Sequence, residues 1–341
     1  MTTRTRPPPE SSAVPLSTRP VGAGAPTGNG TETKQRPASL PPPSIGAGTS
    51  TDSATATEAF AGGRDGTRLY VRHRSGPPGK PTALLCDGLV CDGYIYRYLW
   101  DDLAKLGPVA HFHYRGHGRS GAPVDRDRVD VAAHASDLNA VREHLGDPEV
   151  VLVGHSLGTQ VCLEAYRARP ERVRAMVLLC GSFGRVTHTF KGTDMLSTVL
   201  PNVLDWSAKH PRLLRALWAR VPVRVAVKLG ILTGDIDPNK VRIEDVEPYF
   251  RHALHVDFTL FVRMLQAAGE HSAADLLADV RVPTLVVAGS RDTFTPPEIS
   301  VAMAEAIPGS KLVLIPGASH ILPLEERERV AEVVGEFWAN F

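Results

Sequence analysis

The sequence predicts an α/β protein, with a mostly parallel central sheet and helices on both faces of it. Short runs of consecutive apolar residues recur along the chain, as is typical of strands that are buried on both sides. Segments with helical periodicity separate these runs, and alternating strands and helices indicate a parallel sheet. The third observation is local. The apolar run at 150–153 leads into Gly-His-Ser-Leu-Gly at 154–158, and a helix is expected directly after it, at 157–168.

The first two strands are expected on either side of the glycine-rich turn at 62–67, because residues 68–74 alternate between polar and apolar side chains. This hairpin would open the sheet with an antiparallel pair. The elements expected next, in chain order, are a strand at 82–86, a helix near 95–106, a strand at 109–114, a helix at 131–145, the strand and helix around the pentapeptide, and a strand at 175–180.

Strand-like runs are missing from about residue 182 to residue 279, and helical patterns replace them. Helices are expected there at 195–200, 211–220, 246–255 and 258–268. We therefore predict a helical cap, residues 182–279, inserted into an α/β core that consists of residues 57–181 and 280–341. The core resumes with a strand at 283–288, a helix at 297–306, a strand at 311–315 and a final helix at 325–341.

Residues 1–56 differ in composition from the rest of the chain. They are rich in Pro, Ser, Thr and Gly and have almost no large apolar side chains, so we expect a disordered tail. No apolar run of the secretory type follows the arginines of this tail, and no stretch reaches the roughly 18 apolar residues of a membrane span. A cytoplasmic location is therefore expected.

The charge and the cysteines argue against several kinds of site. The formal net charge is +1 with 22% charged residues, so no basic field points to nucleic acid. The histidines show no clear partners at metal-ligand spacing, and we expect neither a metal nor a cofactor. The cysteines are too few for a disulfide framework and lack a C-x-x-C spacing. We expect buried free thiols at Cys86, Cys91, Cys162 and Cys180.

The pentapeptide predicts a sharp strand-to-helix turn that presents the hydroxyl of Ser156 at the edge of the sheet. A serine hydroxyl becomes a strong nucleophile when an imidazole accepts its proton and a carboxylate orients that imidazole. Polar residues follow two later strands, with Asp292 after the strand at 283–288 and His320 after the strand at 311–315. Because the carboxyl ends of parallel strands meet at one edge, we expect Ser156, His320 and Asp292 to form a catalytic triad there.

The chain resembles α/β-hydrolase fold proteins of the lactonase, esterase and cofactor-free haloperoxidase type over about residues 58–341. The resemblance rests on four motifs, which are Gly-His-Ser-Leu-Gly at 154–158, Arg-Gly-His-Gly-Arg-Ser at 115–120, Gly-Ser-Arg-Asp at 289–292 and Gly-Ala-Ser-His at 317–320. It implies an oxyanion hole built from the backbone N–H groups of Leu89 and Leu157.

One position departs from the pattern of this family. The family usually carries His-Gly after the third strand, whereas this chain has Asp87-Gly88. A carboxylate so close to a site for negative charge would be costly unless it is turned away or paired. We expect an arginine to compensate it, with Arg115 and Arg119 as the candidates.

The resemblance implies a serine hydrolase that acts on a small molecule, namely a carboxylic ester, lactone or thioester with an apolar acyl or alcohol part, through an acyl-enzyme. A cofactor-free haloperoxidase or perhydrolase, a carbon–carbon bond hydrolase and an acyltransferase would keep the same triad. A dehalogenase or epoxide hydrolase of this fold would have Asp in place of Ser156. The Asp87-Gly88 pair and the long tail also leave open a receptor on a hydrolase scaffold, with slow turnover or none. The sequence leaves the oligomeric state undefined.

Overall fold

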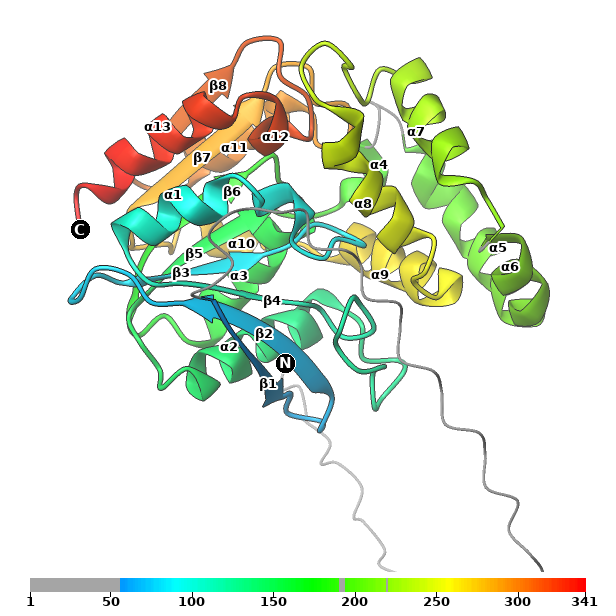
Figure 1. Ribbon diagram of the computed structural model, residues 1–341, viewed down its shortest axis with the longest axis horizontal. Coiled ribbons are helices and arrows are strands. Elements are labelled where there is room, and N and C mark those ends of the chain that lie inside the picture. Colours follow the sequence, from blue (N-terminus) through cyan, green and yellow to red (C-terminus); the bar gives the residue numbers. More distant parts are fainter. Residues whose placement is uncertain (1–55, 190–193, 219) are drawn as a thin grey trace, which may run out of the picture. The chain divides into compact units, whose positions relative to one another are not determined.

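The computed structural model describes residues 56–189, 194–218 and 220–341, and these residues form an eight-stranded sheet with helices around it (Figure 1). The predicted tail lies outside the described residues except for Ala56. The predicted α/β class is confirmed, as is the mostly parallel sheet. The strands are β1 (Thr57–Gly62), β2 (Arg68–Arg74), β3 (Thr82–Cys86), β4 (Val109–Phe112), β5 (Val150–His155), β6 (Val173–Leu179), β7 (Thr284–Gly289) and β8 (Lys311–Ile315).

The strands lie in the order β1-β2-β4-β3-β5-β6-β7-β8. β1 and β2 form the predicted hairpin, and β2 is antiparallel to β4. All the other neighbours are parallel, so six consecutive strands end at the same edge of the sheet. The residues that follow β3, β5, β7 and β8 are therefore brought to one side of the molecule, although the sequence separates them widely.

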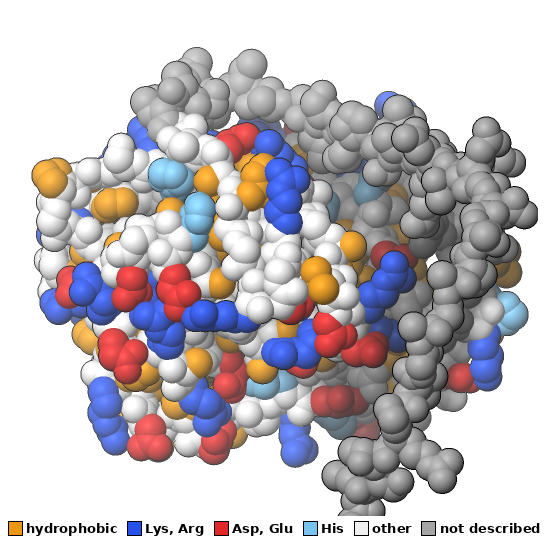
Figure 2. Space-filling model, turned by 90° about the horizontal axis from the view of Figure 1, so that it is seen from below, with side chains coloured by type: hydrophobic (Ala, Val, Ile, Leu, Met, Phe, Trp, Pro, Cys, Tyr) orange, Lys and Arg blue, Asp and Glu red, His pale blue; other side chains and the backbone are white. Residues whose placement is uncertain are grey.

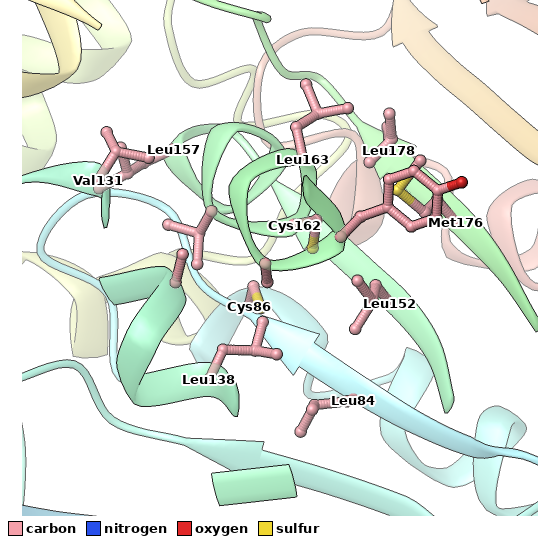
Figure 3. Close-up of a cluster of buried hydrophobic side chains, with 14 of the residues drawn as sticks. Leu84, Cys86, Val131, Leu138, Leu152, Leu157, Cys162, Leu163, Met176 and Leu178 are labelled. Atoms are coloured by element: carbon pink, nitrogen blue, oxygen red, sulfur yellow. The ribbon is translucent and has the colours of Figure 1, made fainter. Parts of the chain in front are cut away.

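Helices cover both faces of this sheet, and this explains why its central strands are continuously apolar. One face packs against α2 (Val131–His144), α3 (Leu157–Ala168) and α11 (Pro297–Ala306). Figure 3 shows Leu84 and Leu152 of the sheet beside Leu138 of α2 and Cys162 of α3. The other face packs against η2 (Tyr94–Tyr96), α1 (Leu99–Leu106), α12 (Leu322–Glu325) and α13 (Arg327–Trp338).

The described residues between β6 and β7 form helices, as the pattern at 182–279 predicts. They are α4 (Val186–Thr189), α5 (Met195–Lys209), α6 (Pro211–Trp218), α7 (Val223–Leu232), α8 (Ile243–Ala253), α9 (Phe258–Glu270) and α10 (Ala274–Leu277). We call residues 182–279 the cap segment. α5 continues past the interior Pro201, where the predicted helix ends, and α7 is not among the predicted helices.

The cysteines agree with the expectation of buried thiols, because all four are buried and free. None of the helices within the described ranges is both long enough and apolar enough to cross a membrane. In the same ranges, no group of three or more His, Cys, Asp or Glu side chains is arranged to hold a metal ion.

A buried ionic network joins the β1–β2 turn to α2. Arg115, in the turn after β4, is 3% exposed, and its Nε and Nη2 donate to the two carboxylate oxygens of Asp137 over 2.8 and 2.7 Å. Its Nη1 donates to Asp65 over 2.9 Å and to the carbonyl of Arg128 over 2.8 Å. The bidentate geometry satisfies a carboxylate that has no access to water, since the side chain of Asp137 is fully buried.

Candidate active site

Ser156 lies at the junction of β5 and α3 in a conformation that few side chains adopt, with φ 55° and ψ −118°. The chain turns so tightly here that only glycine fits two positions away on either side. A Cβ atom on Gly154 would lie 2.4 Å from the carbonyl oxygen of Gly158, and one on Gly158 would lie 2.2 Å from the carbonyl oxygen of Cys86. The strained turn presents Ser156 at the edge where the parallel strands end.

The side chains of Ser156, His320 and Asp292 form a continuous hydrogen-bonded chain. His320 Nε2 lies 3.0 Å from Ser156 Oγ, and His320 Nδ1 lies 2.9 Å from Asp292 Oδ2. The loops after β7 and β8 supply Asp292 and His320, as the sequence predicts. An arrangement of this kind lets the imidazole accept the serine proton while the carboxylate holds the other ring nitrogen protonated.

The surroundings of Asp292 keep its carboxylate ionised. Burial by itself would raise the pKa of Asp292, but the charge and hydrogen bond of His320 and the donors of Thr295 outweigh it, so the pKa lies below its ordinary value. Asp292 Oδ1 accepts from the N–H groups of Phe294 and Thr295, each over 2.9 Å, and the Thr295 hydroxyl lies 2.8 Å from Oδ2. The site therefore holds a charged acceptor in place for His320.

Two side chains that the sequence does not single out as partners hold the His320 loop. The His155 ring lies beside the His320 ring, and its Nε2 is 2.9 Å from the His320 carbonyl oxygen. Burial and the neighbouring His320 lower the pKa of His155 to about 3, so this ring is neutral and donates to the carbonyl. On the other side of the loop, Glu325 accepts from the N–H of Ser319 over 2.6 Å and from its hydroxyl over 2.9 Å.

The two segments whose backbone groups are expected to form the oxyanion hole meet at Ser156. A Cβ atom on Gly88 would lie 3.1 Å from Ser156 Cβ, so the turn that carries Leu89 packs directly against the serine. The N–H of Leu157 is the first of α3, and no carbonyl of the preceding helical turn exists to accept from it. Both N–H groups thus belong to segments that meet at the serine.

The expectation of an arginine partner for Asp87 is wrong. Asp87 is fully buried, and His111 on β4 pairs with it, with 2.7 Å between Nε2 and Oδ2. Arg115 binds Asp137 and Asp65 instead, and Arg119 binds Glu58 over 2.6 Å. The register of the sheet explains the difference. His111 of β4 lies opposite Leu85 of β3, and Asp87 follows two residues later, directly after β3 ends, so the imidazole is close enough to pair with the carboxylate.

Asp92, five residues after Asp87, is expected to make the stability of the fold depend on pH. Burial, and next the nearby charge of Asp87, raise the pKa of Asp92 from 3.8 to about 6. A carboxyl whose pKa is higher in the folded state costs stability as pH rises from about 4 to about 6. We expect Asp92→Asn to increase the free energy of unfolding at pH 7.5 by at most about 3 kcal/mol and to change it little at pH 4.

Urea unfolding at both pH values measures this effect. The exposed Asp102, whose side chain is 38% accessible, supplies the control, because Asp102→Asn should change stability little at either pH. An equal effect of Asp92→Asn at pH 4 and pH 7.5 would contradict the proposed cost of ionisation.

Two family models and several curated proteins match this chain. A family model described as alpha/beta hydrolase fold matches residues 81–222, and one described as TAP-like protein matches residues 262–340. The chain is 30% identical over 261 residues to the polyketide synthase ThaQ of Burkholderia thailandensis, a match that covers 75% of this chain and 12% of that protein. It is 28% identical over 263 residues to the putative carbamate hydrolase RutD of Pseudomonas savastanoi, covering 73% of this chain and 90% of that one.

Among solved structures, the chain is similar to a thermophilic esterase from Thermogutta terrifontis. The TM-score is 0.66 with 22% sequence identity, and the match covers 83% of this chain and 98% of the esterase. Since the identity is low, this likeness concerns the fold. Because the match covers almost the whole esterase, the likeness extends over nearly all of that fold.

Proposed function

Because this chain belongs to the α/β-hydrolase superfamily and is an α/β-fold hydrolase, we propose that it cleaves a carboxylic ester, lactone or thioester through a covalent acyl-enzyme. The observation that carries the proposal is the hydrogen-bonded chain of Ser156, His320 and Asp292, with heavy-atom distances of 3.0 and 2.9 Å. These distances lie within the range that proton transfer between a nucleophile and its base requires.

In the proposed reaction, Ser156 Oγ attacks the carbonyl carbon while its proton passes to His320 Nε2. The imidazolium then gives this proton to the departing alcohol or thiol, and the acyl group stays on Ser156. A water molecule next attacks the acyl carbon and gives its proton to His320, which returns it to Ser156 as the carboxylic acid leaves. Asp292 orients His320 throughout and stabilises the imidazolium.

The oxyanion that forms at each attack needs donors that are already in place. We assign this role to the N–H groups of Leu89 and Leu157, because both segments contact Ser156 and because backbone groups need no particular side chain. A single donor of this type is typically worth about 10² to 10³ in rate. The pairing of Asp87 with His111 is consistent with this assignment, since it gives the buried carboxylate beside Gly88 a hydrogen-bond partner.

We further propose that the cap segment covers this edge of the sheet and shapes the substrate pocket. Its residues contact both loops that carry the triad. The Thr293 hydroxyl, next to Asp292, donates to Asp235 over 3.1 Å, and Lys240 donates to the carbonyl of Gly317 over 2.9 Å. We propose that the substrate has an apolar acyl or alcohol part, as the family resemblance implies.

Reaction with an alkyl fluorophosphonate tests the proposal. We expect a single covalent adduct on the peptide that contains Ser156, and turnover of one or more classes in a panel of p-nitrophenyl esters of graded length, lactones, thioesters and carbamates. The carbamates are included because of the likeness to RutD. An adduct only at other serines would contradict the proposal. So would a tight ligand that is never turned over, which is the behaviour of a receptor.

A further inference from the structure

The outer helices of the cap expose an unusual number of large apolar side chains. Within the described residues, eight of the eleven large apolar side chains that are exposed lie between residues 199 and 232. They are Val199, Trp206, Leu213, Leu217, Val221, Val225, Leu229 and Leu232, with exposed fractions from 36% to 83%. Scattered apolar residues are common on protein surfaces, but a concentration of this kind marks an interaction site.

These side chains are spaced so that each helix presents them on one side. Val199 and Trp206 on α5 are seven residues apart, and Leu213 and Leu217 on α6 are four apart. Other sides of these helices are packed inside the protein, since Leu200 of α5, Leu214 of α6 and Val227 of α7 are buried. Figure 1 shows α5, α6 and α7 as the outermost helices of the cap, with α8 and α9 between them and the sheet.

On α7 the exposed apolar residues follow the same spacing, with Val225, Leu229 and Leu232 at intervals of four and three. Exposed apolar side chains with this spacing on three successive helices indicate that another molecule binds to this surface. We call the exposed sides of α5, α6 and α7 the outer cap surface.

Positive charge is concentrated in the same segment. Residues 195–232 include six Lys and Arg and one Asp, whereas the rest of the chain has 32 Lys and Arg against 36 Asp and Glu. Lys209, Arg220, Arg224 and Lys228 are exposed there. On the face that Figure 2 shows, basic and acidic side chains are intermingled. The outer cap surface thus combines apolar stripes with a basic excess that the chain as a whole lacks.

We propose that the outer cap surface binds an anionic lipid surface. Helices with Leu, Val and Trp on one side and Lys and Arg beside them lie in the interface of a bilayer, where the apolar side chains enter the acyl boundary. The long stems of Lys and Arg let their charges reach the acidic headgroups. The proposal concerns binding alone and is independent of the reaction proposed above.

A second copy of this chain fits the surface less well. A symmetric dimer would place the same surface against itself, so that the excess of Lys and Arg on one protomer would face the same excess on its partner. Acidic headgroups supply the opposite charge without this penalty. The charge of the segment therefore favours a lipid surface over self-association.

Co-sedimentation of the full chain with sucrose-loaded vesicles tests the proposal. We expect the partition coefficient to be at least tenfold higher for vesicles with 30% phosphatidylserine, on the order of a physiological anionic leaflet, than for pure phosphatidylcholine. Higher salt should weaken this binding. The pair Arg224→Gln and Lys228→Gln should reduce the partition coefficient about 25-fold, since each basic residue near an anionic surface contributes about fivefold.

Matched variants show whether binding depends on the outer cap surface itself or on the charge and hydrophobicity of the protein in general. Arg327→Gln with Arg329→Gln removes two exposed charges from α13, whose side chains are 52% and 50% accessible, and should leave binding unchanged. Leu229→Ser with Leu232→Ser should abolish binding, whereas Val124→Ser, at a 65% exposed valine outside the cap segment, should not. Far-UV circular dichroism verifies that each variant is folded.

Three results would overturn the proposal. One is equal partitioning into neutral and anionic vesicles, or no sedimentation with either. Another is a dimer in light scattering that Leu229→Ser with Leu232→Ser converts to a monomer, because it would show that a second copy occupies the surface. The third is binding to an acidic polypeptide such as polyglutamate with none to vesicles, which would indicate an acidic protein partner.

Discussion

Ser156→Ala is expected to lower kcat for ester hydrolysis by about 10⁴ to 10⁶-fold, with a much smaller change in KM. The variant should keep the fold and the proposed oxyanion donors, but it lacks the oxygen that would form the proposed acyl-enzyme. The methyl group of alanine fits, because the turn at Ser156 is set by Gly154 and Gly158 and not by the serine side chain. Residual activity would come from the oxyanion donors acting on a water molecule.

The same measurement on a second variant tests the role of Asp292, and a third variant serves as the control. Asp292→Asn should lower kcat by about 10⁴-fold, because an amide can hold the wrong tautomer of His320 and cannot stabilise its charge. Ser136→Ala, at a partly exposed serine of α2, should leave kcat unchanged. A Ser156→Ala variant that retains more than about a hundredth of the wild-type kcat would show that another group is the nucleophile.

Much of the core could be predicted from the sequence because each buried strand is a separate apolar run. Residues 82–86 and 311–315 form strands with the bounds that their runs predict, and residues 157–168 and 297–306 form the predicted helices. The cap was harder to predict. At 221–227 valine alternates with other residues, which gives a period of two, yet residues 223–232 form α7. The packing of α7 against α8 outweighs this local pattern.

The positions of Ser156, Asp292 and His320 follow from strand order, since each residue lies in the segment that follows a parallel strand, at β5, β7 and β8. The contacts that hold them could not be predicted in this way. Glu325 contacts Ser319 from the last residue of α12, a short helix at 322–325 that the sequence pattern does not predict, since the expected C-terminal helix begins at 325. The partner of Asp87 depends on which residue of β4 lies opposite β3, and register between distant strands has no signal in a single sequence.

The second large effect is expected on stability. Arg115→Met should decrease the free energy of unfolding by about 3 to 5 kcal/mol, because it leaves the carboxylate of Asp137 buried without a partner. In thermal unfolding this corresponds to a drop in Tm on the order of 10 °C. Arg142→Met is the matched control. Arg142 is equally buried, but its partner Asp147 is 36% accessible and stays hydrated, so the loss should be smaller.

Two measurements show whether Arg115→Met destabilises the fold by breaking the charge pair with Asp137 or by removing packing contacts. They are the pH dependence of the stability and the effect of a second substitution. Burial already raises the pKa of Asp137, and without Arg115 this pKa would rise further. A raised pKa costs stability only when the group ionises, so the defect of Arg115→Met should be smaller at pH 5 than at pH 8. Adding Asp137→Leu should restore most of the stability, since no buried charge then remains. A double variant that is as unstable as Arg115→Met at both pH values would contradict this explanation. The guanidinium would then stabilise the fold through its packing and its hydrogen bond to the Arg128 carbonyl, and not through its charge pair with Asp137.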